Sequence, residues 1–312
     1  MPSPPAPPEP TAEIDAAVAR GDRDAALALA DDLVRRGALA AAAHGLERAV
    51  LAFPDEPRFL PRLLEVHLRW RDWDEFDTWS ARALARFPAR ADLHFLVGQA
   101  LEEQDKTCAA IRAYGRAARL DSDDVESIQR IARLFRMRSR PFLARRRLRR
   151  AILHHPETAA LHGAVGYAYV DDGQYAKAVK AFKRAAELEP EDAPWLDHWG
   201  GALLLSERWR DAATVAVRAL KANPSSEKGW TVFAVAHRHL DNADKAERGF
   251  RKAVESARDA SRAQGNLGLY LASLSPTGDL SKEAVRMLEA ALSAHPEWEE
   301  ARNALRGLRG LP

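Results

Sequence analysis

The sequence predicts an all-α fold, an α-solenoid built from stacked antiparallel helix pairs. The prediction rests on three residue registers, each with a period of 34 residues. Two of the registers hold small residues, and the third holds proline. Alanine occupies the first register at Ala49, Ala83, Ala117, Ala151, Ala185, Ala219 and Ala253, and at Ala291 after four additional residues. A period of this length is typical of repeat proteins, in which each repeat packs against its neighbours.

The other two registers explain why each repeat should be a helical hairpin. The second register holds Ala42, Phe76, Ala110, Ala144, Ala178, Ala212, Ala246 and Ala284. The third holds Pro54, Pro88, Pro156, Pro190, Pro224 and Pro296, with Ser122 and Arg258 as exceptions. Small residues let two helices approach closely, and proline ends the second helix so that the chain can turn back.

One repeat shows the pattern most clearly, the stretch GYAYVDDGQYAKAVKAFKRAAELEP that begins at Gly166. It sets Gly166 and Tyr169 on a first helix and Ala178 and Phe182 on one face of a second, which ends at Pro190. This resembles the tetratricopeptide repeat, whose pattern is W-x2-L-G-x2-Y, then A-x3-F, then P, within 34 residues. The resemblance implies a right-handed superhelix of helix pairs and a general function in protein–protein interaction.

The register also predicts the boundaries. Hairpins are expected over residues 57–90, 91–124, 125–158, 159–192, 193–226, 227–260 and 261–298, the last with a longer loop around 275–278. A helix over 299–309 should cap the stack. Counting back places a first hairpin at 23–56, but Gly21-Asp22 also resembles the middle of an earlier repeat, so a start at 12 or at 23 stays open. We therefore expect a proline-rich, solvated tail over 1–11 and a single solenoid of seven to eight repeats over 12–312.

Composition favours an ordinary soluble protein, with 29% charged and 46% hydrophobic residues. No run approaches the roughly 18 apolar residues of a membrane helix, and the N-terminus lacks the features of a secretory signal. The single cysteine, Cys108, cannot form an internal disulfide, which fits a reducing compartment. We expect a cytoplasmic protein.

Motifs for catalysis, metals or cofactors are missing from the sequence. HExxH, GxSxG, GxxxxGK[ST] and GxGxxG do not occur, and no histidine or cysteine cluster has zinc-ligand spacing. His94 and His162 occupy the fourth repeat position, where the family has an aromatic residue, so packing is their expected role. The expectation is a non-catalytic protein without a cofactor.

The resemblance implies a groove lined by repeat positions 2, 5, 6, 9, 12 and 13 of the first helices. Applied to this sequence, it names Arg58, Arg62, Arg69, Gln99, Glu102, Gln129, Arg130, Arg133, Arg136, Tyr167, Val170, Asp197, His198, Leu204, Leu205 and Arg238. The groove should be basic in its first half and more apolar beyond, which suits an acidic peptide or helix of a partner protein. The family's carboxylate clamp, which needs lysine, asparagine and arginine at set positions of three consecutive repeats, is not reproduced. Self-assembly through the ends of the solenoid is compatible with this function.

An alternative function comes from residues 125–158, which hold ten arginines and two acidic residues, a formal net charge of +8. Such a cluster could bind nucleic acid or another polyanion. Several of these arginines, among them Arg145 and Arg150, fall on the second helix, and the interleaved aromatic residues of single-strand-binding grooves are missing. Salt bridges to neighbouring repeats or an acidic protein partner explain the cluster better than nucleic acid does.

Overall fold

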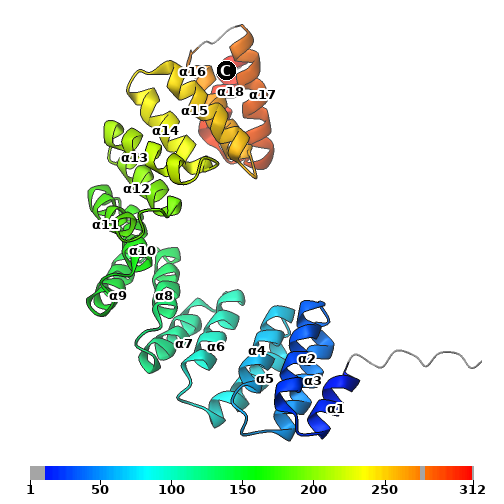
Figure 1. The fold of residues 1–312 in the computed structure, drawn as a ribbon. Helices are drawn as coiled ribbons and strands as arrows, with labels where there is room; N and C mark the ends of the chain where they lie inside the picture. The colour runs from blue at the N-terminus through cyan, green and yellow to red at the C-terminus, as the bar shows by residue number, and fades with distance from the viewer. Residues whose placement is uncertain (1–10, 275–277, 311–312) are drawn as a thin grey trace, which may run out of the picture. The chain divides into compact units, whose positions relative to one another are not determined.

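The computed structural model describes residues 11–274 and 278–310, and all regular structure within them is helical, which confirms the all-α prediction (Figure 1). The helices are α1 (Ala12–Ala19), α2 (Arg23–Arg35), α3 (Leu39–Ala52), α4 (Phe59–Trp70), α5 (Trp73–Arg86), α6 (Ala91–Glu103), α7 (Thr107–Leu120), α8 (Val125–Met137), α9 (Pro141–His154), α10 (Ala159–Val170), α11 (Tyr175–Leu188), α12 (Ala193–Leu205), α13 (Trp209–Ala222), α14 (Glu227–His239), α15 (Ala243–Ser256), α16 (Ser261–Leu274), α17 (Asp279–Ala294) and α18 (Glu299–Leu308). Residues 1–10 of the tail expected over 1–11, and residues 275–277 of the expected long loop, lie outside the described residues.

The chain divides into two compact units, unit 1 up to Arg138 and unit 2 from Ser139. Unit 1 holds α1 to α8, and unit 2 holds α9 to α18. The arginine-rich repeat is therefore shared, with its first helix, α8, in unit 1 and its second, α9, in unit 2. A single solenoid over 12–312 stays a prediction.

Within each unit, consecutive helices pack as the predicted hairpins. Unit 1 pairs α2 with α3, α4 with α5 and α6 with α7, and unit 2 pairs α10 with α11, α12 with α13, α14 with α15 and α16 with α17. The first complete hairpin starts at Arg23, and α1 precedes it and packs against both α2 and α3. At the other end α18 covers α16 and α17, in the position expected of the capping helix.

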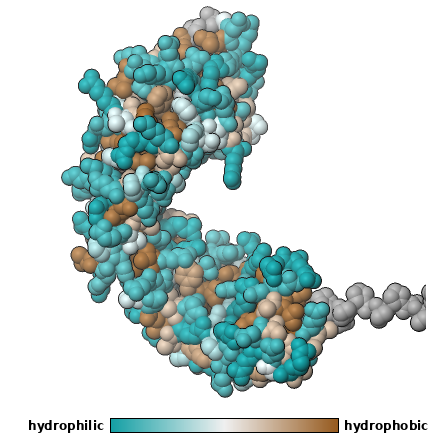
Figure 2. Space-filling model, in the orientation of Figure 1, coloured by the Kyte–Doolittle hydropathy of each residue, from teal (hydrophilic) through white to brown (hydrophobic). Residues whose placement is uncertain are grey.

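The alanine registers form the contacts between helices. All eight alanines of the first register are at most 5% exposed, and seven alanines of the second, together with Phe76, are at most 1% exposed. Larger side chains, such as Phe182 and Phe250, fill the space between the hairpins. On the face that Figure 2 shows, hydrophilic residues predominate and apolar ones form small, separate patches. In unit 1 the buried residues form two clusters, one between Ile14 and Ala100 and a second one around Tyr114 and Ile131.

The turns repeat with the same period. A residue with a positive φ follows the first helix of seven consecutive repeats, at Gly37, Arg71, Asp105, Ser139, Gly173, Glu207 and Asp241. Between hairpins, a ring nitrogen of the fourth repeat position lies within hydrogen-bond distance of the proline carbonyl that ends the preceding hairpin. These pairs are His94 with Pro88 at 3.0 Å, His162 with Pro156 at 2.8 Å and Trp230 with Pro224 at 2.8 Å. The two histidines therefore have the structural role that the sequence predicts.

Candidate functional site

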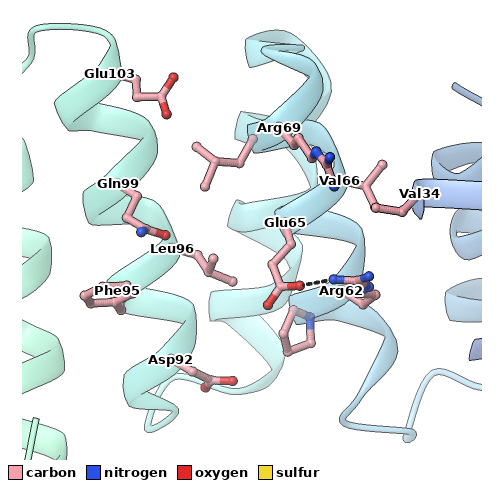
Figure 3. A pocket seen from close by; sticks show the side chains of 12 residues that line it. Val34, Arg62, Glu65, Val66, Arg69, Asp92, Phe95, Leu96, Gln99 and Glu103 are labelled. Atoms are coloured by element: carbon pink, nitrogen blue, oxygen red, sulfur yellow. Dashed lines mark hydrogen bonds and ion pairs between the residues drawn. The ribbon is translucent and has the colours of Figure 1, made fainter. Parts of the chain in front are cut away.

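A pocket of about 540 Å³ lies between the first helices α4 and α6 of unit 1. Its lining, with one residue of α2, is Val34, Pro61, Arg62, Glu65, Val66, Leu68, Arg69, Asp92, Phe95, Leu96, Gln99 and Glu103. Figure 3 shows the α6 side chains Leu96 and Gln99 directed toward α4. We call this hollow the α4–α6 pocket. It brings together first-helix residues of three consecutive hairpins.

Three of the predicted groove residues line the α4–α6 pocket: Arg62, Arg69 and Gln99. Arg58, which is also a predicted groove residue, lies outside it at the N-cap of α4. The guanidinium of Arg58 is held by Glu56 and Asp24, each at 2.7 Å. Arg58 therefore stabilises the junction between two hairpins.

The charges of the α4–α6 pocket are almost balanced. Its three carboxylates each have an arginine partner: Glu65 pairs with Arg62 at 2.6 Å, Asp92 with Arg90 at 2.5 Å and Glu103 with Arg71 at 3.2 Å. Arg62 is also bound by Asp31 at 2.6 Å. Arg69 is exposed and makes no ion pair with the described residues. The unpaired charge of the pocket is thus one cation.

A second hollow, of about 520 Å³, lies along α8 and contains three more predicted residues: Gln129, Arg130 and Arg133. Glu102 forms ion pairs with both arginines, and its distance to Arg130 is 3.6 Å. Arg130 also pairs with Glu126 at 3.2 Å. Glu102 in turn accepts a hydrogen bond of 2.8 Å from the hydroxyl of Tyr114. Burial raises the pKa of Tyr114 to about 12, so this hydroxyl keeps its proton and donates.

Glu102 therefore offsets part of the positive charge of Arg130 and Arg133. Arg136, the last predicted residue of α8, is half-buried on the same helix and has an interaction of its own.

In unit 2 the predicted residues Tyr167 and His198 meet across two hairpins. The Tyr167 hydroxyl lies 2.5 Å from Nε2 of His198, and the two rings pack edge to face at 4.8 Å. Phe182 contacts both rings, at 5.1 Å and 5.6 Å, and Trp195 lies 6.2 Å from His198. Burial, with a smaller contribution from Lys228, lowers the pKa of His198 to about 4. The imidazole is therefore neutral at pH 7, and its Nε2 can accept a hydrogen bond from the Tyr167 hydroxyl.

Asp197 has a structural environment. It is 8% exposed, and its carboxylate accepts a 2.6 Å hydrogen bond from Ser226, whose hydroxyl oxygen accepts the backbone N–H of Gly229 at 2.9 Å. Ser226 is the N-cap of α14. Burial is the main cause of a raised pKa of Asp197. Asp197 thus stabilises the packing of α12 on α14, and it does not line an open surface.

The remaining predicted residues of unit 2 lie on first helices without forming a pocket with the Tyr167–His198 pair. Val170 ends α10 and Leu204 is half-buried near the end of α12. Leu205 is 48% exposed, and Arg238 is exposed on α14. The predicted set is thus brought together only in parts.

Sequence reasoning overlooked the carboxylates and aromatic residues that complete the α4–α6 pocket. Glu65, Asp92, Phe95 and Glu103 occupy the inward repeat positions 9, 2, 5 and 13. The register of inward positions therefore contained the signal for these four residues. Which carboxylate pairs with which arginine depends on neighbouring hairpins, and this information is not local in the sequence.

The structure offers no arrangement for metal binding, since no group of three or more histidine, cysteine, aspartate or glutamate side chains among the described residues could hold an ion. Within residues 11–274 and 278–310, no helix combines the length and apolar character needed to cross a bilayer.

Two segments match family models, and both models are described as tetratricopeptide repeat. The matched residues are 159–192 and 79–125. The first match is the repeat predicted over 159–192, and the second covers parts of α5, all of α6 and α7 and the start of α8. No curated protein matches the chain significantly.

Solved structures share the fold at low sequence identity. A chain of the APC/C hetero-tetramer Cut9-Hcn1 aligns with a TM-score of 0.60 and 16% identity, over 91% of the present chain and 55% of the other, so the present chain spans about half of that chain's length. The C-terminal part of a TPR repeat-containing protein from Cytophaga hutchinsonii aligns with a TM-score of 0.57 and 14% identity, over 78% of this chain and 99% of the other. A tetratricopeptide repeat protein from Parabacteroides merdae gives 0.54 and 13%, over 78% and 96%.

Proposed function

Since the chain is a tetratricopeptide repeat protein, we propose that it is a non-catalytic adaptor that binds an extended peptide or a helix of a partner protein along its first helices. Repeats of this family generally serve as scaffolds for protein–protein interaction. The observation that supports the finer proposal is the α4–α6 pocket, because three consecutive hairpins contribute first-helix side chains to one hollow of about 540 Å³.

The chemistry of the α4–α6 pocket suggests what it would bind. Phe95, Leu96 and Leu68 supply apolar surface, and the carboxylates of the lining are each paired with an arginine. Arg69 is the cation without a partner among the described residues, and Gln99, on the facing helix α6, can donate and accept hydrogen bonds. A segment with an apolar side chain for the floor and a carboxylate for Arg69 would satisfy both groups.

Affinity purification followed by mass spectrometry would identify partners, and variants would then locate the binding surface. Arg69→Glu combined with Gln99→Ala changes exposed or half-buried groups, so the fold should persist. Arg112→Ala combined with Arg116→Ala is the matched control, because both arginines are exposed on the second helix α7. The purified partner should bind the control like the wild type, and the pocket variant at least about tenfold more weakly. Equal affinity for both variants would refute the α4–α6 pocket as the site.

A polyanion is the second candidate ligand, because Arg146, Arg149 and Arg150 are exposed on α9 and make no ion pair with the described residues. Against it, Arg145 of the same helix is bound by Asp172 at 2.8 Å. A salt titration with a generic oligonucleotide distinguishes the two functions, since phosphate neutralisation makes the affinity fall steeply with salt. No binding at about 50 mM salt would remove this candidate.

A further inference from the structure

A pocket of about 350 Å³ lies among the second helices α13 and α15 and the first helix α14 of unit 2. Its lining is Val217, Leu220, Lys221, Pro224, Trp230, Phe233, Lys245 and Arg248. We call it the α13–α15 pocket. The proposed groove residues do not line it, so it is a second and separate surface. Its volume is at the lower end of the range of ligand pockets, about 300–1,000 Å³.

The floor of the α13–α15 pocket is aromatic and held in place. The indole N–H of Trp230 donates a 2.8 Å hydrogen bond to the carbonyl of Pro224. The ring of Phe233 packs edge to face on Trp230 at 5.8 Å and on His237 at 4.4 Å. Because the polar edge of the indole is already bonded, what Trp230 and Phe233 offer to an occupant is apolar ring surface.

The rim of the α13–α15 pocket is cationic. Lys221, Lys245 and Arg248 are exposed and make no ion pair with the described residues, and no carboxylate lines the pocket. The protein itself does not neutralise these three cations, so they can attract the carboxylates of a ligand.

The neighbouring hairpins show that the fold does not require lysine at these positions. One period before and after Lys221 and Lys245, with the four-residue shift counted, every equivalent residue is acidic: Glu187 and Glu255, and Asp211 and Glu283. Lys221 and Lys245 thus carry the opposite charge to the equivalent residues of the adjacent hairpins. Equivalent backbone positions accept either sign, so the lysines are not there for the packing of the helices.

Val217 also differs from the equivalent residues of the adjacent hairpins, because it is apolar and they are charged. It is 42% exposed, whereas the residues one period away are the charged Lys183 and Arg251. An exposed valine at the mouth of an aromatic pocket extends its apolar surface toward the solvent.

We propose that the α13–α15 pocket binds an acidic segment of a partner protein that inserts one apolar side chain between Trp230 and Val217. The flanking carboxylates of that segment pair with Lys221, Lys245 and Arg248. A protein segment fits better than nucleic acid or a lipid surface, since a narrow apolar floor needs a single projecting apolar group, which a phosphate backbone does not provide.

The probe is a short synthetic peptide in which phenylalanine and leucine are flanked by aspartate and glutamate. A second peptide keeps the acids and replaces both apolar residues with alanine. Binding is followed through the indole N–H signals of the protein labelled with ¹⁵N, of which its eight tryptophans give one each. The Trp230 signal is assigned with Trp230→Phe. We expect the apolar peptide to shift this signal and the alanine peptide to bind much more weakly.

Lys221→Glu combined with Lys245→Asp tests the rim, because it introduces the acids that neighbouring hairpins tolerate. It should weaken binding of the apolar peptide by at least about tenfold. Lys180→Glu combined with Lys183→Glu makes the same change of charge on the exposed face of α11 and should leave the affinity within about twofold. Val217→Lys introduces the residue found one period earlier, Lys183, and should weaken binding by removing apolar surface while the three rim cations stay in place.

Three results would overturn the proposal: no binding of the apolar peptide, binding without a shift of the Trp230 signal, or equal affinity for the peptide with alanines. The last would show attraction by charge alone. The function proposed for the α4–α6 pocket is unaffected by any of these results, since it is tested separately by Arg69→Glu with Gln99→Ala, which leaves the α13–α15 pocket intact.

Discussion

Gly166 is the position where one added methyl group should test the packing of a hairpin most directly. A Cβ atom there would lie 2.7, 2.8 and 2.9 Å from three carbons of the Phe182 ring. Phe182 is 2% exposed and is held by the rings of Tyr167 and His198, so it has little room to move. Gly166→Ala should therefore force the two helices of the hairpin apart.

Two opposing effects determine the size of the change. Alanine is better than glycine inside a helix by about 1 kcal/mol, and overpacking a dense core costs about 1–3 kcal/mol. The net expectation for Gly166→Ala is a loss of about 1 kcal/mol in the free energy of unfolding, up to about 2 kcal/mol. Gly201, inside α12, is the control, because a Cβ atom there has nothing within 4 Å. Gly201→Ala should gain about 1 kcal/mol from helix propensity alone.

Both variants can be compared with the wild type by urea denaturation followed by far-UV circular dichroism, with hydrogen exchange of α10 and α12 as a local readout. The expected result is opposite signs for the same chemical substitution. If Gly166→Ala were more stable than the wild type, as Gly201→Ala should be, the close approach of α10 and α11 would be wrong.

Three further substitutions test other parts of the structure. Glu207 has a left-handed backbone with φ of 57°, so Glu207→Gly should raise the free energy of unfolding by about 0.5–1 kcal/mol in urea denaturation, and a loss would contradict the turn geometry. The pKa of His198 falls from 6.5 to about 4 on folding, so the unfolded chain binds the proton first; stability should decline between pH 6.5 and 4, by roughly 3 kcal/mol at most, and His198→Gln should remove that part of the slope. Tyr114→Phe deletes the hydrogen bond to Glu102 and should cost about 1–2 kcal/mol, and an unchanged melting curve would contradict that bond.

The fold was predictable because its determinants are local and periodic. Alanine at two fixed positions, proline after the second helix and turn residues between the helices act within one hairpin and repeat along the chain. The structure shows packed hairpins within each unit and buried alanines in both registers, and a further helix, α18, follows the last hairpin. The left-handed turn position was not predictable in this way, since glycine marks it only at Gly37 and Gly173.

For the candidate site, the sequence predicts which repeat positions face inward, but it does not predict the charge of the surface that they form. Of the residues that the inward register selects, Arg62, Arg69 and Gln99 line the α4–α6 pocket. The register does not predict the net charge there, because long side chains reach across hairpins: Arg62 is bound by Asp31 of the preceding hairpin. A count of arginines thus overestimates how basic a surface is when each guanidinium can reach a carboxylate about 31 residues away.

The comparison of repeats with one another indicates where a partner would be selected. At the first alanine register every repeat has the same buried residue, since a larger side chain would separate the two helices. The ninth position of the first helices, which includes Gln99, has a different residue in each of seven repeats: Asp31, Glu65, Gln99, Arg133, Tyr167, Gly201 and Val235. Equivalent positions share the same backbone environment, so this variety shows that the hairpin does not restrict the residue there. The first helices can therefore change their side chains without loss of the fold, and differences among those side chains are what would distinguish one partner from another.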